Sequence, residues 1–218
     1  MPIELQSELT SLRRDLLTMG AMVERRLTRV IDALVEHDLD AAHEVREGDD
    51  EIDRMETLIE EHAMRLLALA HPVAGDLRLV LAVMRINTDF ERMADLARGI
   101  SKRILRLAEI EHDELPADLV DIAFAARTML TDVLVALGNE DATLGRHVRN
   151  SDRRVDDINK AILLWARQQM PSHPEWVDAD LEIMAIAQRF ERIADLSASV
   201  ATEVIFLVEG QLSRHATA

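Results

Sequence analysis

The sequence of 218 residues is 48 % apolar, which is enough to build a sizeable core, but only 3 % of it is aromatic and it contains no Tyr. Its net charge of −16 argues against general binding to nucleic acid and against docking onto an anionic membrane surface, because both need a basic footprint. The lack of Cys excludes disulfides and thiolate metal sites, so a metal would need oxygen ligands or His. Seven Gly and five Pro supply little turn chemistry for a β protein, which favours an all-α fold.

The sequence contains no recognisable targeting or membrane-spanning segment. It lacks an N-terminal stretch that is basic and then apolar, as in a signal peptide, and it lacks a run of about 18 apolar residues. We therefore expect no transmembrane helix and no membrane insertion, and we expect the protein to be cytoplasmic.

Apolar residues recur in alternating steps of three and four along most of the chain, which is the pattern of long packed helices. Pro72 and Pro171 interrupt this pattern, and Gly48 marks an expected bend within one helix. We expect Asp76 to cap the helix that follows Pro72, and Gly210 to end the last helix. The expected helices span residues 3–37, 41–70, 77–107, 117–137, 141–169 and 178–209.

A six-residue phrase occurs twice, as Phe-Glu-Arg-Met-Ala-Asp at residues 90–95 and as Phe-Glu-Arg-Ile-Ala-Asp at residues 190–195. Many apolar and acidic positions around the two phrases also match when the sequence is shifted by 100 or 103 residues. We therefore expect two tandem units of three helices, each packed up-down-up because the connections are short. The predicted division is a first repeat at residues 1–110, an acidic linker at 108–116 and a second repeat at 117–218.

Each phrase places two carboxylates four residues apart, Glu91 with Asp95 and Glu191 with Asp195, on one face of a helix. In an acidic chain such a pair often does no more than solvate a helix face. Here, however, a second acidic pair recurs at equivalent positions of the preceding helix in each half, and like charges at this spacing repel. The pattern therefore favours bound cations, and the candidate metal ligands are Asp49, Asp53, Glu91, Asp95, Asp152, Asp156, Glu191 and Asp195.

These acids are expected to line the edge of a groove between two helices. In both phrases the Glu directly follows a seam residue, Phe90 or Phe190, so the acids flank the core. Arg92 and Arg192 are poorly placed to neutralise them, because each lies about 100° around the helix from the Glu before it. Four carboxylates that face one another across such a groove would make a hard, oxygen-rich site suited to Mg²⁺, Mn²⁺, Fe or Ca²⁺.

Two further polar residues bear on the metal sites. Asn87 lies one turn before Glu91 and extends the first acidic stripe, whereas its counterpart is Ala187, so the second site should be poorer or different. His62 lies on an apolar seam with no acidic stripe on its face. We expect it to be a core or interface residue and not a ligand.

Over nearly its whole length the chain resembles the PhoU family of bacterial phosphate-uptake regulators. The resemblance rests on His-Pro-Val-Ala-Gly-Asp-Leu-Arg at residues 71–78, on the two phrases, and on Glu-Val-Ile-Phe-Leu-Val-Glu-Gly at residues 203–210. It implies an all-α fold of two tandem three-helix up-down-up bundles with six long helices. It also implies that the acidic motifs named above hold clusters of iron or of another metal, such as manganese, magnesium or zinc.

The same resemblance implies a function. A member of this family would be a negative regulator of phosphate uptake and phosphate-starvation signalling, and would therefore act on transcription indirectly. It would work as a non-enzymatic adaptor, often a homodimer, between the ATPase of the Pst phosphate ABC transporter and a PhoR-type sensor histidine kinase. Two other interpretations stay open. One is a metal-free helical scaffold; the other is a di-iron carboxylate enzyme, which needs Glu-x-x-His motifs, whereas the chain has only Glu109 with His112.

Overall fold

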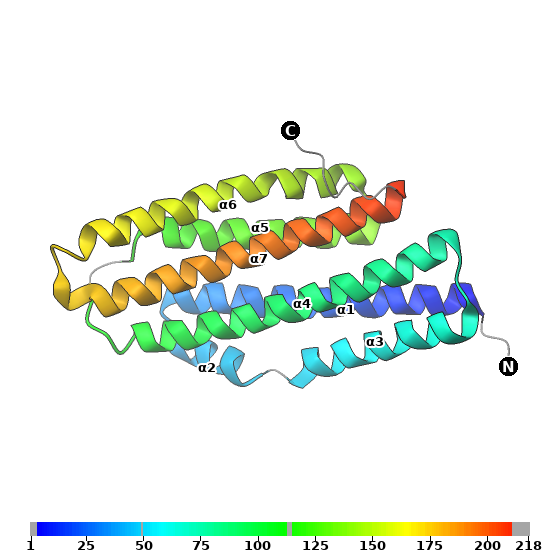
Figure 1. Ribbon diagram of the computed structural model, residues 1–218. Helices are drawn as coiled ribbons and strands as arrows, with labels where there is room; N and C mark the ends of the chain where they lie inside the picture. The colour runs from blue at the N-terminus through cyan, green and yellow to red at the C-terminus, as the bar shows by residue number, and fades with distance from the viewer. Residues whose placement is uncertain (1–3, 49, 113–114, 211–218) are drawn as a thin grey trace.

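The computed structural model describes residues 4–48, 50–112 and 115–210, which form an elongated bundle of long helices without any β-strand in these ranges (Figure 1). The prediction of an all-α fold is confirmed. Within the same ranges, no helix is both long and apolar enough to cross a membrane. The elements are α1 (Leu5–Glu36), α2 (Leu39–Glu47), α3 (Asp50–Ala70), α4 (Ala74–Leu107), α5 (Ala117–Asn139), α6 (Ala142–Gln169), the short 3-10 helix η1 (Pro174–Trp176) and α7 (Val177–Glu209).

The helix expected over residues 41–70 is in fact two helices, α2 and α3, so the prediction of one bent helix was wrong at this point. Helix α2 ends at Gly48, whose N–H donates to the Glu44 carbonyl at 3.0 Å. Glycine favours such an end because it is a poor helix former. Helix α2 also begins earlier than expected, since the Asp38 side chain accepts a hydrogen bond from the Ala41 N–H at 3.0 Å and so caps it.

The start of α4 differs from the prediction. Asp76 is not the N-cap of α4, because the helix begins before it and the N-cap residue is Val73, in extended conformation. Asp76 lies in the first turn instead, where the helix dipole favours a negative charge. The expected end of α7 is confirmed, since Gly210 follows it with a φ of +70°, a backbone conformation that suits glycine.

Helices α4 and α7 run antiparallel, side by side, through the middle of the bundle (Figure 1). Helix α4 also packs against α1, α2 and α3, and α7 packs against α5 and α6, so this pair joins all the helices around one hydrophobic core. The two phrases lie near the middle of the pair, with Phe90 and Phe190 fully buried. An ion pair between Arg85 and Glu203, at 3.0 Å, links the two helices. The division of the chain into two repeats stays a prediction.

Gly20 allows α1 to approach the helices beside it. A Cβ added to this buried glycine would lie 3.0 Å from the Phe90 ring of α4 and closer still to the Leu134 side chain of α5. Because protein interiors are close-packed, a larger residue at this position would have to displace both neighbours. The absence of a side chain at Gly20 is therefore a packing requirement of the core.

Replacement of Gly20 by a branched residue should destabilise the bundle. We expect Gly20→Val to lower the free energy of unfolding by about 2 kcal/mol, because the added methyl groups overpack the contact with Phe90. Gly138→Ala is the matched control, since an added Cβ at this exposed position would have no neighbour within 4 Å. The control should keep or slightly raise stability in urea unfolding. Equal midpoints for Gly20→Val and the natural chain would contradict this account of the core.

Candidate metal centres

An acidic cluster forms where α6 packs against α7. Asp152 and Asp156, one turn apart on α6, face Asp195 on α7, and each offers a carboxylate oxygen within 4.8 Å of the other two. All three side chains are partly buried. Glu191 lies one turn before Asp195 on the same helix and completes the set of four acids named from the sequence for this half. The antiparallel packing of α6 and α7 thus brings together residues about 40 positions apart in the chain.

The electrostatics of this cluster favour a cation. Burial, together with the carboxylates of Asp195 and Asp156, raises the pKa of Asp152 from 3.8 to about 6. Burial and the same two carboxylates also raise the pKa of Glu191. One oxygen of Asp152, Oδ1, is buried and has no hydrogen-bond partner in the described part of the chain. A buried, unpartnered carboxylate oxygen among like charges fits a bound cation, and the all-oxygen donor set suits a hard one.

Arginines neutralise one acid of each phrase, which the sequence analysis did not foresee. Arg192 Nη1 lies 3.0 Å from Asp195 Oδ2, three residues further along the helix. In the first half Arg98, and not Arg92, forms the corresponding ion pair with Asp95. Partly exposed ion pairs of this kind contribute little to stability, so they relieve the repulsion only in part.

A second cluster lies between α3 and α4 and is less closely convergent. It contains Asp53 and Glu56 of α3 with Glu91 and Asp95 of α4. Burial is the main cause that raises the pKa of Glu91. The carboxylates of Asp95 and Glu56, and a hydrogen bond with Asp95, raise it further. Burial and neighbouring acids likewise raise the pKa of Glu56. Asp49 lies outside the described residues.

Glu56 is the member of this cluster that the sequence analysis missed. It lies three residues after Asp53, on the same face of α3, so a search at this spacing would have found it. Among the residues that the structure places, no three acids of this cluster between α3 and α4 converge within 4.8 Å. The cluster between α6 and α7 is therefore the more closely convergent of the two within the described chain.

Buried amides accompany both clusters. Asn87 is buried, and its Nδ2 donates to the Glu56 backbone carbonyl at 3.0 Å, so it links α4 to α3. Its Oδ1 is buried without a partner in the described structure. The second half has no amide at the equivalent Ala187, but Asn159, the counterpart of Glu56, is buried with its Oδ1 unpartnered as well. Each cluster thus has a buried amide oxygen nearby that has no hydrogen bond.

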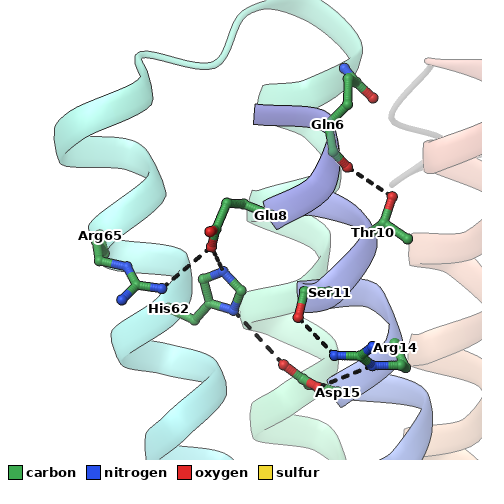
Figure 2. Close-up of polar contacts among 8 residues, drawn as sticks. All are labelled: Gln6, Glu8, Thr10, Ser11, Arg14, Asp15, His62 and Arg65. Atoms are coloured by element: carbon green, nitrogen blue, oxygen red, sulfur yellow. Dashed lines mark hydrogen bonds and ion pairs between the residues drawn. The ribbon is translucent and has the colours of Figure 1, made fainter. Parts of the chain in front are cut away.

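His62 is an interface residue, as the sequence analysis expected. It is 8 % exposed, and its Nε2 lies 2.8 Å from a carboxylate oxygen of Glu8 on α1. Figure 2 shows that Arg65 approaches the same carboxylate, at 3.4 Å, and that Asp15 lies on the other side of the imidazole ring. The acids that contact His62 therefore come from α1 and not from its own helix. This group ties α3 to α1 and is separate from both acidic clusters.

Comparison with known proteins agrees with the all-α fold. Residues 16–104 and 119–204 each match the sequence profile of the PhoU domain. The phosphate-specific transport system accessory protein PhoU homolog of Pseudomonas putida is 33 % identical over 215 residues, which cover 97 % of this chain and 83 % of that protein.

Two crystal structures of PhoU proteins have nearly the same fold. The structure of PhoU from Pseudomonas aeruginosa has a TM-score of 0.92 at 32 % identity, with 95 % of this chain and all of that chain covered. The structure of the phosphate transport system regulatory protein PhoU from Streptococcus pneumoniae has a TM-score of 0.90 at 27 % identity, with 97 % of this chain and all of that chain covered. The two profile matches and the full-length relatives together show that the chain belongs to the PhoU family.

Proposed function

We propose that this protein is an accessory protein of phosphate transport that acts as a negative regulator of phosphate uptake and phosphate-starvation signalling. The observation that carries the proposal is the similarity, over 97 % of the chain, to a protein named as an accessory protein of the phosphate-specific transport system. In this role it is a non-enzymatic adaptor, and its partners are the transporter ATPase and a PhoR-type sensor histidine kinase. A homodimeric state and a cytoplasmic location are further parts of this proposal.

The proposal includes metal ions as structural or modulating ligands. In the second half, Asp152, Asp156 and Asp195 would hold the ion, since their carboxylates converge and Asp152 Oδ1 has no other partner in the described structure. The oxygen-only donor set favours magnesium, manganese or iron over zinc, which more often takes nitrogen or sulfur ligands. A bound cation would remove the mutual repulsion of these acids, and so would stiffen the contact between α6 and α7.

The two alternatives find less support. A di-iron carboxylate enzyme needs Glu-x-x-His motifs that point into a helical core. Glu109 and His112 lie beyond the end of α4, in the segment that leads to α5, and thus outside any helix. A metal-free scaffold is the second candidate function. Replacement of the clustered Asp residues by Asn distinguishes this scaffold from a metal-binding protein.

Loss of two carboxylates should weaken cation binding in the second half. We expect Asp152→Asn with Asp195→Asn to reduce the affinity for Mn²⁺ by at least about tenfold, because two of three convergent ligands lose their charge. Calorimetric titration of the purified chain measures this. Asp157→Asn is the matched control, as Asp157 is exposed on the same helix and pairs with Lys160. Equal Mn²⁺ binding by the double variant, or no binding by the natural chain, would favour the metal-free scaffold.

Cation binding should also depend on pH. A cation must displace the proton from Asp152, whose pKa is about 6, so the affinity for Mn²⁺ should fall about tenfold for each pH unit below about 6. In the metal-free protein the raised pKa has the opposite effect: protonation favours the fold, and the free energy of unfolding should decrease as pH rises from about 4 to about 6. Titrations and urea unfolding across this range measure both trends. Asp152→Asn should flatten both, and an unaltered pH profile in that variant would contradict the assignment.

The regulatory role predicts a loss of repression. In cells that lack their own PhoU protein, the natural chain should restore repression of a phosphate-starvation reporter at high phosphate. Glu191→Ala with Asp195→Ala should leave the reporter near its level in starved cells, because half of the acidic cluster is removed.

Asp178→Ala, an exposed acid of the same helix, is the control and should repress normally. Circular dichroism confirms that each variant is folded. The tagged natural chain should also co-purify with the transporter ATPase and the sensor kinase from phosphate-rich cells. Full repression by a folded double variant would exclude these acids from function, and failure of the natural chain to repress would count against the regulatory role itself.

A further inference from the structure

A pocket of about 340 Å³ is lined by residues of α6, η1, α7 and the segment that follows α4. Figure 1 shows that these segments meet at the end of the bundle where α6 turns into α7. Both tryptophans of the chain line the pocket, Trp165 from α6 and Trp176 from η1. The ring of His173 stacks on Trp176, with the ring centroids 4.1 Å apart. In a chain with only 3 % aromatic residues, this is an unusual concentration of aromatic surface. The remaining lining residues are His112, Gln169, Asp180 and Ile183.

Asp180 is a buried acid of this pocket without a partner. Its side chain comes from the first turn of α7, and the residue is only 3 % exposed. The Oδ2 atom is buried and accepts no hydrogen bond from any residue that the structure describes. Burial raises the pKa of Asp180, and the nearby His173 opposes this only in part. The start of a helix favours a negative charge, but it does not supply the missing donor to Oδ2. A buried carboxylate left in this state is costly, so a donor from outside the chain would stabilise it.

The equivalent region of the first half has no unmatched buried acid among its described residues. His62 occupies the position equivalent to Trp165, and it lies 2.8 Å from the Glu8 carboxylate. Arg65 adds a second donor to the same carboxylate (Figure 2). In the second half an indole replaces this imidazole, and the buried acid Asp180 stands where the first half has the buried apolar residue Val80. The pocket thus combines an unmatched acceptor with aromatic walls.

The chemistry of the lining selects the class of ligand. A metal ion is a poor fit, because the possible ligand atoms of His112, His173 and Asp180 do not all lie within 4.8 Å of one another. Indole faces attract cations, and a carboxylate forms its strongest hydrogen bonds with charged N–H donors. We propose that this pocket binds an alkylammonium or guanidinium cation, whose N–H groups donate to Asp180 and whose charge lies against Trp165 and Trp176. This site goes beyond the proposed regulatory role and does not depend on it.

The charge around the pocket supports the entry of a cation. Exposed acids lie next to the lining residues in the sequence, with Glu111 beside His112, and Glu175 and Asp178 on either side of Trp176. The chain as a whole carries a net charge of −16. A cleft with an excess of one sign of charge raises the local concentration of the opposite ion, so cations are favoured and anions are disfavoured here.

Tryptophan fluorescence reports directly on this pocket, because the chain has no other Trp and no Tyr. Titration of the full chain with n-butylammonium, and separately with propylguanidinium, at constant ionic strength should give a saturable change in emission. Asp180→Asn keeps the size of the side chain and removes its charge, so it should weaken binding at least about tenfold. Asp157→Asn, which changes an exposed acid of α6 outside the pocket lining, should bind as the natural chain does.

A test on the natural chain alone guards against a variant that does not fold. n-Butanol has nearly the shape of n-butylammonium but no charge, and it should bind far more weakly. Tetramethylammonium has the charge but no N–H donor, and it should bind between the two. The proposal is overturned if neither cation gives a saturable change, if butanol binds as tightly as butylammonium, or if folded Asp180→Asn binds like the natural chain.

The same assay identifies the source of the cation. Blocked lysine and arginine amides carry the charged group as it occurs in a protein side chain. Binding of these amides as tightly as the free alkyl cations would support a basic side chain of a partner as the ligand. Binding of the free cations alone would support a small organic amine.

Discussion

Helices α4 and α7 bury Phe90 and Phe190 in the core that they share, and this contact fixes the rotation of both helices about their axes. Successive residues of a helix point about 100° apart, so the Glu that follows each Phe is turned away from the centre of the core. The acids of α4 are thereby directed toward α3, and those of α7 toward α6. Apolar packing thus determines the positions of both acidic clusters, and no favourable interaction between the carboxylates is needed to bring them together.

Apolar burial is strong enough to hold these like charges together. A fully buried Phe contributes about 1.5–3 kcal/mol, whereas a like-charged pair one turn apart costs only a few tenths of a kcal/mol. The repulsion therefore does not separate the helices. It appears instead as a change in acidity, because burial and neighbouring carboxylates raise the pKa of Glu91, Asp152 and Glu191. These carboxylates therefore hold protons more readily than exposed acids do.

Periodicity predicted the long helices because the spacing of apolar residues records which face of each helix is buried. It predicted the end at Gly210, but it did not distinguish a bend from a break at Gly48. At the break, Arg26 of α1 donates a hydrogen bond to the Gly48 carbonyl, a tertiary contact that no local pattern reports. The eight candidate acids were visible as a repeated spacing. Asp180 was not, because it is one acid among 41 and only the fold buries it. Its pocket combines residues from α6, from η1 and from the segment around His112, and no local pattern reports that they meet.

The two halves use the same scaffold but leave different groups unsatisfied. In the described part of the chain, the carboxylate oxygens that are buried without a hydrogen bond belong to Asp152 and Asp180, and both lie in the second half. In the first half, His62 at the place equivalent to Trp165 contacts Glu8, and the buried apolar residue Val80 stands at the place equivalent to Asp180. Selection for stability alone would favour such internal partners in both halves. The two unmatched buried acids on α6 and α7 therefore place in the second half the carboxylates that gain most from a donor or cation outside the chain.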